Sequence, residues 1–87
     1  MKVAIWDTYV EKKDGKKMHF DIAVPEEEKN ALKIYHFGQE YLKGKDVQSE
    51  TLSAKECVFC HIENANEVMV NAIQSKGYYI IEMENCD

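Results

Sequence analysis

The chain has 87 residues, of which 45% are hydrophobic and 31% charged, and its formal net charge is −5. That length allows one hydrophobic core, so we expect a single domain over residues 1–87. The acidic balance and the lack of arginine argue against a nucleic-acid partner, because phosphate backbones are bound by lysine and arginine. No stretch approaches the roughly 20 apolar residues of a membrane-spanning helix, and no signal-peptide pattern is visible, so we expect a cytoplasmic protein with no membrane partner.

Residues 3–10 and 17–24 alternate as strands do, and Asp14-Gly15 between them is a strong hairpin signal. A two-residue turn would put Asp7 on the apolar face. A three-residue loop with Gly15 in the left-handed conformation instead makes one face almost wholly apolar, and burial of a face fixes register. That face carries Ala4, Trp6, Thr8, Val10, Met18, Phe20, Ile22 and Val24. In this register Asp7 lies opposite Asp21, and Tyr9 lies opposite His19.

A helix is predicted over residues 26–43, because apolar residues recur at helical spacing between Pro25 and Gly44. Gly38 in its middle costs about 1 kcal/mol relative to alanine, which suggests a close crossing over a strand. Residues 45–56 are polar and are expected to be irregular.

The pattern resumes with a strand over residues 57–63, in which Val58, Cys60 and Ile62 share one side. A second helix follows, with Asn64 as its cap and Gly77 at its end. Residues 78–83 form a nearly unbroken apolar run, which favours a last strand that is covered on both faces. Such a strand either lies in the centre of the sheet or is covered by a partner subunit across the open face.

The element order is therefore β-β-α-β-α-β, and the fold class is α+β. Right-handed crossovers predict a two-layer sandwich, with a mixed four-stranded sheet and both helices packed on one face. The other face is left open, where a second copy of the chain has room to form a homo-oligomer.

Four strings carry a resemblance to a known family: WDTYV (6–10), MHFDI (18–22), ECVFCHIE (56–63) and GYYIIEM (77–83). Together they resemble a small bacterial family that is known only as a domain of unknown function. The resemblance implies a bacterial source and a compact α+β fold. It implies no activity, cofactor or catalytic residue.

Cys57, Cys60 and His61 have the C-x-x-C-H spacing of covalent haem attachment, but no export signal supports haem. The same three residues could ligate zinc, with Cys86, His19 or His36 as the fourth ligand, although residues three apart on a strand point to opposite faces. A thiol-redox pair is a third reading, but the following helix begins on the wrong side of both sulfurs. The simplest reading makes Cys60 a small core residue, since free cysteine is often buried.

The open sheet face collects polar residues at the odd-numbered hairpin positions. Asp7, Tyr9, His19 and Asp21 point to it, and His61 and Glu63 join them if the third strand lies beside the hairpin. Such a face suits a cation, a polar ligand or a basic side chain of a partner. It also suits proton transfer, with His61 and Glu63 as an acid–base pair, since histidine titrates near neutrality. A simply solvated face remains the alternative.

We therefore predict a non-enzymatic cytosolic domain that binds a protein partner or a small polar ligand through this face, without a cofactor. The predicted binding residues are Asp7, His19, Asp21, His61 and Glu63. The alternative is a thiol-redox or zinc-binding role for Cys57, Cys60 and His61.

Overall fold

The computed structural model describes residues 1–12, 14–45 and 57–86. Its elements are β1 (Lys2–Glu11), β2 (Lys17–Pro25), α1 (Ala31–Gly44), β3 (Cys57–Asn64), α2 (Glu67–Lys76) and β4 (Tyr79–Glu84). The predicted order β-β-α-β-α-β is confirmed, and so is the α+β class. The irregular segment that the sequence predicts falls largely on residues 46–56, outside the described residues.

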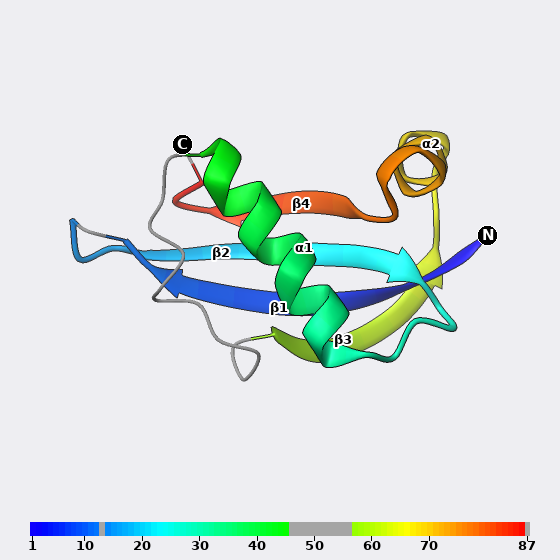
Figure 1. Cartoon of the computed structure of the whole chain (residues 1–87), viewed down its shortest axis with the longest axis horizontal. Coiled ribbons are helices and arrows are strands. Elements are labelled where there is room, and N and C mark those ends of the chain that lie inside the picture. The colour runs from blue at the N-terminus through cyan, green and yellow to red at the C-terminus, as the bar shows by residue number, and fades with distance from the viewer. Residues whose placement is uncertain (13, 46–56, 87) are drawn as a thin grey trace.

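One four-stranded sheet has the strand order β3-β1-β2-β4, and every neighbouring pair is antiparallel. The prediction of a mixed sheet is wrong. The strands β2 and β3 do run in the same direction, as expected for a crossover through α1, but β1 lies between them. The chain then passes through α2 to the opposite edge, where β4 pairs with β2 (Figure 1).

The predicted hairpin register is confirmed. Asp7 pairs with Asp21 and Tyr9 with His19, and Gly15 has a φ of 87°, in the left-handed region that glycine adopts without steric cost. The Gly15 N–H donates to the Lys12 carbonyl over 3.0 Å and closes the loop. The even-numbered hairpin residues consequently share one buried face.

The helix α1 covers this even-numbered face. Its buried residues, Ile34, Gly38 and Leu42, are spaced four apart, and Ile34 and Leu42 pack into one cluster with the hairpin core. Figure 1 shows α1 crossing the sheet obliquely, from β3 towards β4. At its far end Lys45 lies 2.7 Å from the Glu82 carboxylate, which also accepts a hydrogen bond from the Tyr41 hydroxyl.

The helix α1 begins five residues later than predicted. Asn30 is its cap, because the Asn30 Oδ1 accepts a hydrogen bond from the Leu32 N–H over 3.0 Å. Glu26, Glu27 and Glu28 begin the predicted helical range 26–43, but they lie in the connection from β2. There Glu28 accepts from the Asn30 N–H over 3.1 Å.

The helix α2 packs on the opposite, odd-numbered face, so the prediction that both helices share one face is wrong. The physical reason is that Val3, Ile5 and Ala23 are apolar at this end of the sheet and need cover, which Met69 and Ile73 supply. Its cap is Asn66, two residues later than predicted, because β3 extends to Asn64. Figure 1 shows α2 at the end of the sheet near the N-terminus.

The first half of the strand β4 is partly covered on both faces, although the strand lies at an edge and not in the centre of the sheet. Ile80 packs against the cluster that contains α1, whereas Tyr79 and Ile81 pack against the cluster that contains α2. The two helices on opposite faces therefore explain the apolar residues 79–81, whereas Met83, at the end of the predicted run, is exposed.

A β-bulge in β3 overturns the alternation predicted for that strand. Ile5 pairs with His61, but the next residue, Trp6, pairs with Phe59, so Cys60 is an extra residue without a pairing partner in β1. Phe59 packs edge-on against Trp6, with ring centroids 5.9 Å apart. Cys60 is consequently exposed and is not the core residue that the sequence suggested.

The glycine that ends α2 offers a test of this packing. Gly77 has a φ of 95°, and a Cβ there would stand 3.3 Å from the Cζ of Phe37, whose ring stacks on Tyr78. We expect Gly77→Ala to lower the free energy of unfolding by about 1–2 kcal/mol, because the left-handed backbone and the Phe37 ring both oppose a Cβ. Urea unfolding measures this.

Gly44→Ala is the matched control, since a Cβ at Gly44 meets no atom within 4 Å. We expect it to be neutral or stabilising by less than about 1 kcal/mol. Equal losses for the two variants would contradict the conformation assigned to Gly77.

Candidate functional site

The polar part of the odd-numbered face lies beyond the area that α2 covers. The hairpin strands β1 and β2 place Asp7, Tyr9, His19 and Asp21 there, because alternate side chains of a strand point to one face. The strand β3 adds Cys60, His61 and Glu63 at the sheet edge. These residues form two groups that differ in burial and in chemistry.

The first group, which we call the carboxylate–histidine cluster, consists of Asp7, His19 and Asp21. The His19 Nε2 lies 3.1 Å from the Asp21 Oδ1 and 3.7 Å from the Asp7 Oδ1. The His19 ring stacks on Tyr9, with centroids 4.3 Å apart and planes 13° apart. The cluster is half-buried, and Asp21, at 8% exposed, is the deepest of the three.

Burial, the largest cause, and the neighbouring Asp7 carboxyl together raise the pKa of the Asp21 carboxyl from 3.8 to about 6. Two carboxylates directly opposed on paired strands repel each other, which favours the protonated form of one. His19 acts against this rise in pKa, through its charge and its hydrogen bond. Asp21 therefore titrates near neutrality, where a carboxyl group can exchange a proton for another cation.

The second group, which we call the edge cluster, consists of Cys60, His61 and Glu63. The His61 Nδ1 lies 3.2 Å from the Cys60 Sγ, and the His61 Nε2 lies 3.3 Å from a Glu63 carboxylate oxygen. The order thiol, imidazole, carboxylate matches that of a nucleophile, its base and an orienting group. The three side chains are exposed, and none of them lines a described pocket.

The electrostatics of the edge cluster do not favour a nucleophile. Desolvation raises the pKa of the Cys60 thiol, and the charge and hydrogen bond of Asp7 raise it further. Reactive cysteines have lowered pKa values, because the thiolate is the attacking species. Cys60 is therefore held as a neutral thiol. Its hydrogen bond with Asp7 also connects the edge cluster to the carboxylate–histidine cluster.

All five predicted binding residues lie on this face, in the two groups just described. The alternative set of Cys57, Cys60 and His61 is not brought together. Cys57 is buried in the core cluster beneath α1, whereas Cys60 and His61 lie on the other face. The third cysteine, Cys86, is buried and donates to the His19 carbonyl over 3.2 Å.

Cys60 is a member of the polar face that the sequence does not predict, because a regular strand turns this side chain the other way. A signal was present in the pattern. Phe59 and Ile62 are both apolar although they are three positions apart, a spacing that puts residues of a regular strand on opposite faces. Only a bulge puts both beside the apolar hairpin positions.

Within the described residues, no helix has both the length and the apolar character that crossing a bilayer requires.

Comparisons with known proteins agree on the fold and assign no activity. No curated protein matches the sequence. The chain is similar to a solved structure, the NMR structure of protein NE1680 from Nitrosomonas europaea, at 36% identity and a TM-score of 0.85 over 100% of both chains. That bacterial relative fits the source that the sequence motifs imply. A family model described as a domain of unknown function, DUF2024, matches residues 1–83. The chain belongs to the DUF2024 family.

Proposed function

We propose that this protein is a cytosolic, non-enzymatic binding domain whose ligand is a divalent transition-metal ion, held by Asp7, His19 and Asp21. One observation carries the proposal: each residue offers one ligand atom, and these three atoms lie within 4.8 Å of one another. The free state of all three cysteines supports a reducing compartment.

The spacing of the ligand atoms suits a metal ion. Metal–ligand distances of about 2.1 Å put the ligand atoms of a tetrahedral site roughly 3.4 Å apart. The His19 Nε2 lies 3.1 Å from one carboxylate oxygen and 3.7 Å from the other, so the two separations lie on either side of this value. The two carboxylate oxygens also lie within 4.8 Å of each other.

The ligand types select the class of metal. Imidazole nitrogen suits zinc, copper, iron and nickel, whereas magnesium and calcium prefer oxygen ligands alone. One nitrogen and two carboxylate oxygens therefore favour a borderline ion such as Zn²⁺ over Mg²⁺. The Cys60 thiol beside Asp7 is a soft group close to this site, which strengthens the same preference.

The fold preorganises these ligands. Asp7, His19 and Asp21 project from two fully paired strands, and the His19 ring is stacked on Tyr9. Without a cation the two carboxylates oppose each other, which adds to the effect of burial in raising the pKa of Asp21. A divalent ion neutralises this repulsion, so binding relieves a cost that the fold already carries.

Metal titration of the purified protein tests the proposal. We expect isothermal titration with ZnCl₂ to show one equivalent bound by the wild type, and Asp21→Asn to weaken binding by about tenfold or more, because a coordinating oxyanion is lost. Asp7→Asn should act in the same direction. MgCl₂ should not compete.

Glu63→Gln is the matched control, since it removes an exposed carboxylate from the same face and leaves the carboxylate–histidine cluster intact. It should bind zinc as the wild type does. The proposal fails if zinc does not bind, or if Glu63→Gln abolishes binding while Asp21→Asn does not.

The raised pKa of Asp21 also predicts how the metal-free protein responds to pH. The pKa of Asp21 is about 6 in the folded protein, and the ordinary value of 3.8 applies to the unfolded chain. Folding therefore favours the protonated form of this carboxyl group. The resulting stability is fully present below pH 3.8 and is lost as the pH rises through about 6. The groups that face Asp21 are Asp7, His19 and the Cys60 thiol.

Asp21→Asn should remove this pH dependence. In urea unfolding with a metal chelator present, we expect the variant to exceed the wild type by about 2 kcal/mol at pH 8 and to equal it at pH 4, following the linkage between pKa shift and stability. A variant that is less stable than the wild type at pH 8 would show that the Asp21 carboxylate is stabilising, contrary to the electrostatics described above.

A further inference from the structure

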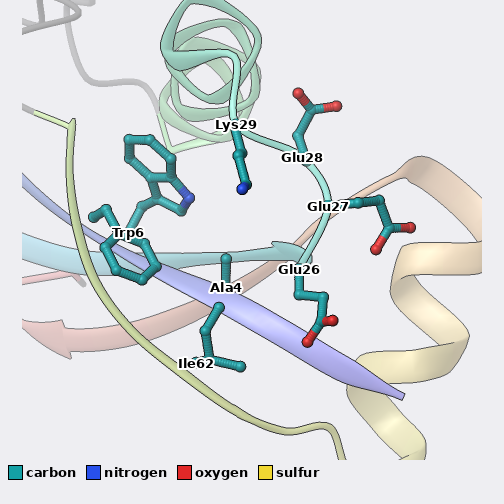
Figure 2. Close-up of a pocket in the computed structure, with 8 residues that line it drawn as sticks. Ala4, Trp6, Glu26, Glu27, Glu28, Lys29 and Ile62 are labelled. Carbon is teal, nitrogen blue, oxygen red and sulfur yellow. The ribbon is translucent and has the colours of Figure 1, made fainter.

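A groove lies on the other face of the sheet, away from the carboxylate–histidine cluster. Figure 2 shows it between β1, β3 and the segment that joins β2 to α1. Its floor consists of Ala4, Trp6, Phe59 and Ile62, its rim is residues 26–29, and its volume is about 860 Å³. This volume is within the range of small-molecule sites.

The floor of the groove is apolar and partly open to solvent. Phe59 is 49% exposed and Ile62 is 43% exposed, although both lie beside buried residues of β1. The bulge at Cys60 creates this surface, because it turns both side chains to the face that α1 covers only in part. Exposed apolar side chains gathered in a hollow favour the burial of an apolar ligand.

The indole of Trp6 presents an unsatisfied donor. Trp6 is 9% exposed, and among the described residues no group accepts a hydrogen bond from its Nε1. A buried donor without an acceptor costs about 1–3 kcal/mol. Figure 2 shows the indole nitrogen directed into the groove and the side chain of Lys29 extending from the rim into the same groove. Two donors therefore line the groove, and within the described residues the indole donor has no acceptor.

The three glutamates of the rim do not supply that acceptor. Figure 2 shows the carboxylates of Glu26, Glu27 and Glu28 directed away from the indole. Glu28 is also paired with Lys33, 3.0 Å away, and hydrogen bonding to the Asn30 N–H and to Lys33 lowers its pKa. The inside of the groove thus offers donors, while negative charge is kept at its mouth.

We propose that this groove binds a small monocarboxylic acid with an apolar body. One carboxylate oxygen accepts from the Trp6 Nε1–H and the carboxylate pairs with the Lys29 ammonium, while the apolar body lies on Phe59 and Ile62. A ligand with a single negative charge satisfies both donors. The glutamates at the mouth of the groove repel ligands that carry two or more negative charges. The inference does not depend on metal binding, since the two sites lie on opposite faces of the sheet.

The single tryptophan makes the test direct, because the ¹H–¹⁵N spectrum contains one indole resonance. Octanoate is the probe, with octylammonium and octanol as probes of the same length and different charge. We expect octanoate to shift the Trp6 indole proton downfield in a saturable manner. Lys29→Gln should weaken octanoate binding about tenfold, as expected for a lost charge-assisted hydrogen bond.

Lys43→Gln is the matched control, since it removes the same charge from the exposed end of α1, outside the groove. It should bind octanoate as the wild type does. The proposal is overturned if octylammonium binds more tightly than octanoate, if octanol binds equally well, or if Lys43→Gln weakens binding as much as Lys29→Gln. It is equally overturned if octanoate leaves the indole resonance unmoved.

Discussion

The structure depends on the burial of one face of the β1–β2 hairpin beneath α1. Phe20, Ile22 and Val24 are fully buried there, and a shift of one residue in the hairpin register would turn all of them to the opposite face. That constraint decides where every odd-numbered side chain points. Asp7 and Asp21 oppose each other because the core beneath α1 leaves them no other register, even though the pair is repulsive.

The hairpin register and the element order followed from the sequence because both depend on local signals: alternation, an Asp-Gly turn and helix-ending glycines. The same signals placed Asp7, His19 and Asp21 on one face. The side of the sheet that α2 covers was not predictable in this way, because it depends on which strands become neighbours. Cys60 was misplaced because one extra residue in β3 changes the direction of its side chain, and a strand pattern alone does not reveal where pairing shifts.

The two helices divide the odd-numbered and even-numbered faces unequally. The helix α2 is short and covers only the end of the sheet near Val3, Ile5 and Ala23, which leaves the carboxylate–histidine cluster accessible. The helix α1 is longer but begins only at Ala31, so the β2–α1 connection, and not a helical turn, borders the floor formed by Trp6 and Ile62. Both candidate sites thus exist because a helix stops short of covering its face.

The bulge at Cys60 sets a strict requirement on the length of β3. It changes the phase of the strand, so that Phe59 and Ile62 share the side of the sheet that carries Trp6. Deletion of one residue there would restore a regular phase and exchange the apolar and polar sides of half the strand. Among homologous chains, positions 57–64 should therefore tolerate substitutions better than insertions or deletions. The length of β3, more than the identity of its residues, determines which side chains point to each face of the sheet.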